Sequence, residues 1–191
     1  MSESAKKERH LPGEEGVWFL ILGDLLVFTL LFAVFLYYRS LEVPLFNTSS
    51  ALLNQAFGII NTLFLLTSSL FVVLGLQAIR IGKQRLAPRF FAVALFFGIG
   101  FSVVKILEYR EKISAGYTLH TDNFFMFYYV LTGTHFLHVV VGLVVLALMI
   151  MLSRKNSLSG QEMQLLEGGG CYWHLVDLLW IILFPLLYLV K

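Results

Sequence analysis

The sequence predicts an all-α integral membrane protein, folded as a bundle of five transmembrane helices. Hydrophobic residues make up 58% of the chain, and charged residues make up 14%. A helix needs about 20 mostly apolar residues to cross a bilayer. Five segments meet that requirement, at about residues 17–38, 57–79, 90–109, 124–152 and 171–190. They are too long, and alternate too little, for barrel strands, so helices are the expected spanning structure.

The charged residues predict how this bundle is oriented. Residues 1–16 form a polar tail, and residues 17–191 are expected to form one domain with short loops. Nine lysines and arginines flank the predicted helices on one side, and four flank them on the other. The positive-inside rule therefore predicts a cytoplasmic amino terminus and an external carboxyl terminus. We interpret the basic loop at 80–89 as an anchor at an anionic membrane surface, and no nucleic-acid partner is expected.

Turn-forming residues predict the shape of the connections. Residues 41–50 are expected to form an outer loop, because Pro44 and the Asn47–Ser50 sequence favour turns. Residues 153–170 form the longest inner connection, and its last three residues, all glycine, predict a flexible entry to the fifth helix. Pro185 is expected to kink that helix, because proline cannot donate a backbone hydrogen bond.

Ionisable side chains inside the predicted spans are the candidate functional residues. Each costs roughly 2.5–3.5 kcal/mol to insert on translocation scales, so it needs a partner or a purpose. At a rise of about 1.5 Å per residue, three of them fall about 5–10 Å from the inner boundary, where a small polar cluster is expected. The other two fall near mid-membrane. The residues near the inner boundary are Asp24, His174 and Asp177, and those near mid-membrane are His135 and His138.

These histidines are expected to form hydrogen bonds rather than to bind a metal. His138 and His174 differ by about 16 Å in depth, whereas a metal–nitrogen bond is about 2 Å long. His135 and His138 share one helical face, so they cannot approach a haem from opposite sides. The sequence therefore predicts no metal ligands in this chain.

A second ionisable pair lies in the outer part of the third predicted helix. Lys105 and Glu108 are three residues apart, so they share a helical face and are expected to pair. Lys105 is expected to extend outward toward the interface. A contact with another subunit is the alternative role for this pair.

Several segments resemble, in order, the subunit III family of haem-copper respiratory oxidases. Two are the most specific: Thr132-Gly133-Thr134-His135-Phe136-Leu137-His138-Val139, and Tyr172-Trp173-His174-Leu175-Val176-Asp177-Leu178-Leu179-Trp180. The earlier matching segments are Trp18 to Asp24, Asn61-Thr62 to Ser68-Ser69, and Gly98 to Glu108-Tyr109. Three positions depart from the family pattern. Asp24 replaces a frequent glutamate, Lys105 replaces a neutral or acidic residue, and Phe136 replaces a glycine.

The resemblance implies an accessory, non-catalytic subunit with no haem or metal of its own. The haem and metal would belong to a catalytic partner in aerobic or denitrifying electron transport. The resemblance also implies bound phospholipid, support of proton uptake and catalytic lifetime, and location in a bacterial inner membrane. The short five-helix form is similar to the subunit III homologue associated with bacterial nitric oxide reductases.

Two other functions remain open from the residues alone. A small proton-coupled transporter would use the buried carboxylates as a relay. A b-type haem electron carrier would use His135 or His138 as an axial ligand, and the purified chain would then be coloured.

Overall fold

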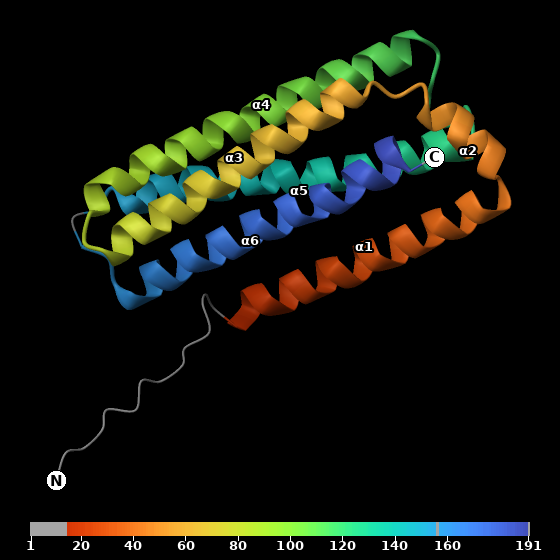
Figure 1. Ribbon diagram of the computed structural model, residues 1–191. Helices are drawn as coiled ribbons and strands as arrows, with labels where there is room; N and C mark the ends of the chain where they lie inside the picture. Colours follow the sequence, from red (N-terminus) through yellow and green to blue (C-terminus); the bar gives the residue numbers. More distant parts are fainter. Residues whose placement is uncertain (1–14, 156, 191) are drawn as a thin grey trace.

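The computed structural model describes residues 15–155 and 157–190, and its regular structure is helical (Figure 1). Within these described residues, five helices are long and apolar enough to cross a membrane, which confirms the predicted fold class. The long helices are α1 (Glu15–Leu41), α3 (Gln55–Arg80), α4 (Ala87–Ser114), α5 (Asn123–Ser153) and α6 (Gly160–Phe184). The short elements are α2 (Val43–Ser50), the 3₁₀ turn η1 (Gln84–Leu86) and the π-helical turn η2 (Pro185–Leu189).

Helices α3, α4, α5 and α6 form a four-helix bundle, in which α3 and α5 each contact both α4 and α6. Helix α1 lies outside this bundle against α5 and α6 (Figure 1). Only 17% of the most apolar stretch of α1 is buried, compared with 56% in α6. The protein therefore consists of a packed four-helix body and one loosely attached helix with a large exposed apolar surface.

Glycines allow the helices of the body to approach closely around one tryptophan. A Cβ atom on Gly142 would lie 2.6 Å from the Trp173 ring, and one on Gly98 would lie 2.9 Å from the same ring. Trp173 is fully buried, so its indole occupies the space that these two glycines leave. Small residues at such positions are the usual way for membrane helices to pack.

The fifth membrane helix begins earlier than the sequence predicted. Helix α6 starts at Gly160, where Ser159 and Glu162 form a reciprocal capping box. Gly168, Gly169 and Gly170 therefore lie inside a helix, and the expected flexible entry is absent from this described segment. A Cβ atom on Gly169 would lie 2.9 Å from the sulfur of Met149. The glycines serve close packing against α5 and α3, not chain flexibility.

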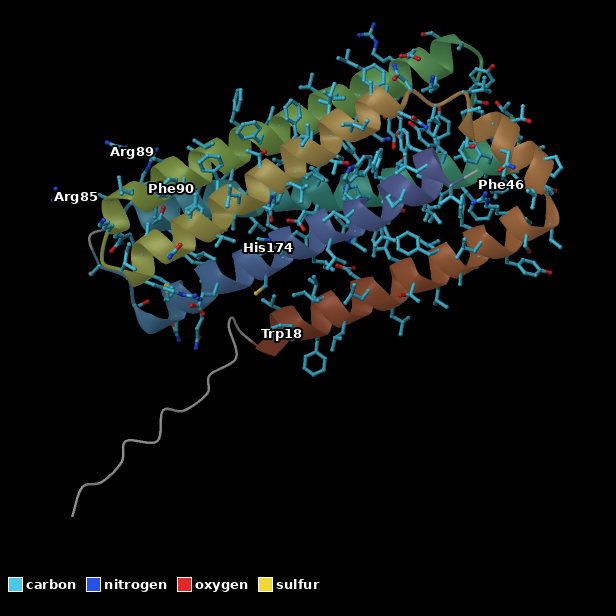
Figure 2. All side chains as sticks on the ribbon, in the orientation of Figure 1. Trp18, Phe46, Arg85, Arg89, Phe90 and His174 are labelled. Atoms are coloured by element: carbon cyan, nitrogen blue, oxygen red, sulfur yellow. The ribbon has the colours of Figure 1, made fainter. Side chains whose placement is uncertain are left out.

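The predicted outer loop at residues 41–50 is also helical. Pro44 occupies the first turn of α2, a position that requires no backbone N–H donor. Phe46 anchors this helix, because its buried ring lies 5.5 Å from that of Phe35 and 5.7 Å from that of Phe124 (Figure 2). Pro185 ends α6, and the chain continues as the π-helical turn η2.

Candidate functional site

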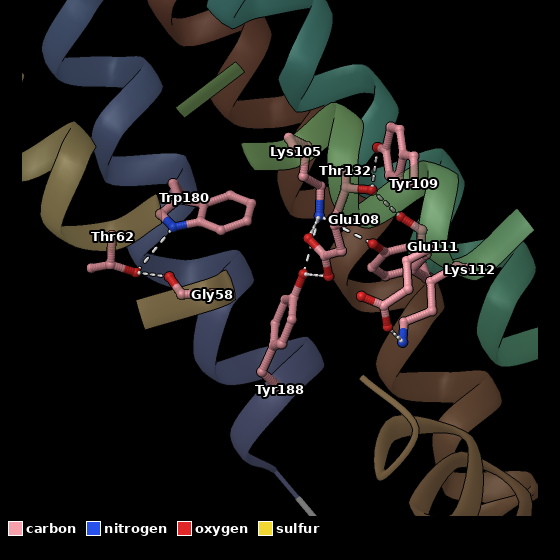
Figure 3. A network of polar contacts seen from close by, with 11 residues as sticks. Gly58, Thr62, Lys105, Glu108, Tyr109, Glu111, Lys112, Thr132, Trp180 and Tyr188 are labelled. Carbon is pink, nitrogen blue, oxygen red and sulfur yellow. Dashed lines mark hydrogen bonds and ion pairs between the residues drawn. The ribbon is translucent and has the colours of Figure 1, made fainter. Parts of the chain in front are cut away.

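The most completely buried ionic contact connects α4, α5 and η2. We call Lys105, Glu108, Tyr128 and Tyr188 the lysine cluster (Figure 3). The Lys105 ammonium lies 3.0 Å from Glu108 Oε2, 3.0 Å from the Tyr188 hydroxyl and 3.3 Å from the Tyr128 hydroxyl. The Tyr188 hydroxyl also donates to Glu108 Oε1 at 2.6 Å.

The lysine cluster is neutral overall and has no direct path to solvent. Lys105 is 1% exposed and Glu108 is fully buried. An ammonium has three hydrogens, and each has an oxygen acceptor here. The Tyr128 ring also faces the ammonium, with its centroid 4.7 Å away. The expectation that Lys105 extends outward is therefore wrong, because these groups replace the water that the ammonium would find at the interface.

Residues of the family-like motifs connect helices beside this cluster (Figure 3). The Thr132 hydroxyl donates to the Tyr128 carbonyl at 2.5 Å, so Tyr109 donates its own hydroxyl hydrogen to Thr132 at 2.6 Å. The Trp180 indole N–H donates to the Thr62 hydroxyl at 3.1 Å, which connects α6 to α3. These motif positions hold neighbouring helices together. Gly133 has open space where a Cβ would lie.

A contact between a carboxyl group and an imidazole joins α1 to α5. Asp24 Oδ1 lies 3.2 Å from His138 Nε2, and we call these two residues the Asp24 pair. His138 Nδ1 donates to the Thr134 carbonyl at 2.8 Å, and it must carry a hydrogen because a carbonyl only accepts. The contact between Nε2 and the carboxyl is a hydrogen bond when either atom carries a hydrogen. The side chains are 24% and 17% exposed, so this pair is only partly enclosed.

The expected cluster of Asp24, His174 and Asp177 does not form. Asp24 pairs with His138 instead, because α1 starts further along the bundle than α6 (Figure 1). His174 Nδ1 lies 2.5 Å from the Ser69 hydroxyl and 3.4 Å from Asp177 Oδ2. The shorter contact is the stronger hydrogen bond, since contacts beyond about 3.2 Å are weak.

His135 and Asn61 are fully buried in the body, but unlike the side chains described above they lack hydrogen-bond partners among the described residues. Among the described residues, neither ring nitrogen of His135 has a hydrogen-bond partner, and neither amide atom of Asn61 has one. The His135 ring lies 5.7 Å from Phe101 and 5.4 Å from Trp180. Within residues 15–155 and 157–190, no three histidine, cysteine, aspartate or glutamate side chains are placed to hold a metal ion.

An apolar groove separates the loosely attached helix from the body. It has a volume of about 650 Å³ and lies between α1, the last turns of α5 and the first turns of α6. Val17, Leu20, Val145 and Leu148 are among its lining residues, and Lys155 also lines it. Tyr172 lines the groove and donates to the His138 carbonyl at 3.3 Å, so one lining side chain contacts the backbone of the Asp24 pair.

Sequence reasoning missed three of the contacting side chains. Tyr128 and Tyr188 lie near helix ends, where tyrosine usually faces the membrane interface. Ser69 appeared in the sequence only as part of the segment from Asn61-Thr62 to Ser68-Ser69, which does not indicate a histidine partner. The only sequence signal for Tyr188 is Pro185, which precedes the π-helical turn that contains it.

The fold and these contacts define a class of protein: a membrane protein with five candidate spans, in which most ionisable side chains of the described spans pair within the chain. A family model described as "Cytochrome c oxidase subunit III" matches residues 12–191. The chain therefore belongs to the cytochrome c oxidase subunit III family.

Individual relatives agree with this family. The chain is 31% identical to cytochrome c oxidase subunit 3 of Synechocystis sp., over 92% of this chain and 74% of that protein. It is 27% identical to cytochrome bo(3) ubiquinol oxidase subunit 3 of Buchnera aphidicola, over 91% of this chain and 84% of that protein. It is 37% identical to part of a haem-copper oxidase subunit I+III of Aeropyrum pernix, over 50% of this chain and 12% of that protein. The matched region spans about half the length of some other curated relatives.

Proposed function

We propose that this chain is a non-catalytic accessory subunit of a haem-copper respiratory oxidase or a nitric oxide reductase. The observation that carries the proposal is the family match over residues 12–191. The Aeropyrum pernix relative supports the choice of partner, because its name joins subunit III to subunit I in one chain. The partner would hold the haem and metal, and this chain would sustain its turnover in a bacterial inner membrane.

The Asp24 pair is the proposed point of action on the partner. It places a carboxyl group beside an imidazole within a predicted span, and it is only partly enclosed by this chain. Tyr172, which lines the apolar groove, donates to the His138 carbonyl. A partner helix or a water chain would therefore reach it more easily than it would reach the lysine cluster. In this role Asp24 supports proton uptake by the partner and delays its inactivation.

The apolar groove is the proposed phospholipid site. Its lining residues are almost all apolar, and a groove open to the bilayer is filled by acyl chains. A bound lipid would also join α1 to the four-helix body, which would stabilise a helix with few protein contacts of its own.

The test is a pull-down of the tagged chain from its native membrane in a mild detergent, with mass spectrometry and a reduced-minus-oxidised spectrum. Recovery of a haem-bearing catalytic subunit supports the proposal, and oxygen or nitric oxide turnover by the complex identifies the enzyme. Recovery of the chain alone contradicts it. Proton-driven flux in liposomes from this chain would then favour a transporter, and a Soret band in the isolated chain would favour a haem carrier.

The geometry already disfavours His138 as an axial haem ligand. Its Nδ1 donates to the Thr134 carbonyl, and its Nε2 contacts Asp24. A haem iron would have to displace Asp24, and the carboxylate would then lose its partner inside the membrane. That loss is costly for an ionised group in hydrocarbon.

A further inference from the structure

Three side chains of the family-like motifs have buried polar atoms that find no partner among the residues the structure describes. They are Asn61 on α3, His135 on α5 and Trp173 on α6, and all three are fully buried. Buried polar groups in native proteins are almost always hydrogen-bonded, either to protein or to ordered water. These groups therefore require an explanation that contacts within the chain do not supply.

Asn61 and His135 lie at one level of the four-helix body. Their helices, α3 and α5, are diagonal to each other, because each contacts both α4 and α6. The Trp180 ring lies 5.4 Å from the His135 ring, and its indole N–H donates to Thr62, the residue next to Asn61 (Figure 3). Since both side chains are fully buried, they point from opposite helices toward the axis of the body.

The side chains around this level offer no hydrogen bond to either residue. Phe101 packs edge-on against both rings, with its centroid 5.7 Å from that of His135 and 5.0 Å from that of Trp180. The Lys105 ammonium lies 5.3 Å from the Trp180 ring, but each of its hydrogens already has an acceptor in the lysine cluster. The partner of Asn61 and His135 is therefore a separate molecule.

The unpartnered atoms indicate a small neutral ligand that both donates and accepts hydrogen bonds. The Asn61 amide has two N–H hydrogens and an acceptor oxygen, and a neutral His135 imidazole has one donor and one acceptor. An ion would bring an uncompensated charge into the body, because the lysine cluster is already neutral. Water donates and accepts, and it is small enough for a fully enclosed site with several polar groups.

We propose that Asn61 and His135 share an internal water site at the axis of the four-helix body. The bound water connects α3 to α5, two helices whose polar side chains do not reach each other directly at this level. Trp173 lies seven residues from Trp180 along α6, which is about 10 Å, so its N–H belongs to a different position. The site gives a role to two motif residues that pair with no described side chain.

The direct test is X-ray hydroxyl-radical footprinting of the native chain in nanodiscs, read by mass spectrometry. Radiolysis of a bound water oxidises the side chains beside it, even where bulk solvent cannot reach them. Phe101 is the reporter. Phe91 is the matched control, because it is an equally buried phenylalanine on the same helix and packs against Gly75.

We expect oxidation at Phe101 and only background at Phe91. Background at both positions would overturn the water site. Equal oxidation at both would mean that water enters the whole body, and it would also contradict a specific site. The footprint requires no variant, so it is decisive even where a substitution prevents folding.

The sign of a stability change provides a second test. Asn61→Leu replaces the amide by an apolar side chain of similar volume, and unfolding is measured in mixed micelles titrated with sodium dodecyl sulfate. Loss of a hydrogen bond to the water should raise the unfolding equilibrium constant about fivefold. A dry amide without a partner would give the opposite result, because its removal would lower that constant. A lower constant would therefore overturn the proposal.

His135→Phe and the double variant complete a double-mutant cycle. Two side chains that bind the same water are coupled, so the double variant should raise the unfolding constant by less than the product of the two single effects. A double effect equal to that product would show independent sites and would contradict the shared one.

Discussion

The lysine cluster and the Asp24 pair are both contacts between ionisable side chains inside a membrane bundle, but the protein encloses them to different degrees. Lys105 and Glu108 are at most 1% exposed, and every charged atom has a partner on α4, α5 or η2. Asp24 and His138 are 24% and 17% exposed, and they join the loosely attached helix α1 to the body. The cluster can therefore act only on this chain, whereas the pair remains accessible to a lipid, a proton or another subunit.

This difference predicts opposite consequences of mutation. A closed ionic contact contributes to stability only while all of its partners are present, because each remaining charge becomes an unpaired group in an apolar interior. A partly enclosed contact loses less, since lipid headgroups, water or a neighbouring chain can replace the missing partner. Stability should therefore depend on the lysine cluster, and function on the Asp24 pair.

The largest effect is expected from Glu108→Gln. This change leaves the Lys105 ammonium buried without a counter-charge and should reduce the free energy of unfolding by about 3–5 kcal/mol. The double variant Lys105→Met/Glu108→Leu removes both charges and should recover most of that loss. Unfolding in mixed micelles titrated with sodium dodecyl sulfate measures both values. Equal losses in the single and double variants would show that the charges are not coupled.

An intermediate effect is expected from Tyr188→Phe. The phenol donates to Glu108 and accepts from Lys105, and hydrogen bonds to charged groups contribute about 1.5–3 kcal/mol. Tyr37→Phe is the matched control, because Tyr37 is 62% exposed and lies outside the cluster. The control should change the free energy of unfolding by less than about 0.5 kcal/mol. A similar change in both variants would mean that η2 is not held by the cluster.

A smaller effect on stability is expected from Asp24→Asn. The amide can still hydrogen-bond to His138 Nε2, so the loss should be about 1 kcal/mol, the difference between a charged and a neutral hydrogen bond. The same variant should shorten the catalytic lifetime of the partner complex, because an amide cannot take up or release a proton as the Asp24 carboxyl can. Tyr188→Phe provides the comparison, since it lowers stability more and should leave the catalytic lifetime unchanged. A longer catalytic lifetime in Tyr188→Phe than in Asp24→Asn would show that stability of this chain and catalytic lifetime of the complex depend on different contacts.

The smallest effect is expected from Arg80→Gln. Arg80 forms an ion pair with Glu167 at 2.8 Å, but its side chain is 57% exposed. Exposed ion pairs contribute about 0–1 kcal/mol, so this variant sets the lower limit for an ionic contact in this protein. Thermal unfolding in the same micelles measures it. A loss as large as that of Glu108→Gln would mean that burial does not determine the strength of these contacts.

The five spans were predictable because length and hydropathy alone decide whether a helix crosses a membrane. The start of α6 was not predictable from the sequence. Three consecutive glycines at 168–170 favour a flexible segment, and only the neighbouring helices show that they serve close packing. The pairing of Lys105 with Glu108 follows from a spacing of three residues on one helix. The pairing of Asp24 with His138 depends on how α1 is shifted along the bundle, and depth measured along each helix separately cannot show that shift. The predicted outward direction of Lys105 was also wrong. Its partner Tyr188 comes from a distant segment of the chain, so the helix that carries Lys105 does not reveal this contact.

The separation of a structural contact from a functional one is tested most directly in the assembled complex. The measurement compares the number of turnovers before inactivation for complexes that contain the native chain, Asp24→Asn, or Lys105→Met/Glu108→Leu, at equal recovery of this chain with its partner. We expect Asp24→Asn to assemble normally and to inactivate earlier, and the double variant to match the native lifetime. A native lifetime in Asp24→Asn, or an equally shortened lifetime in both variants, would contradict this account.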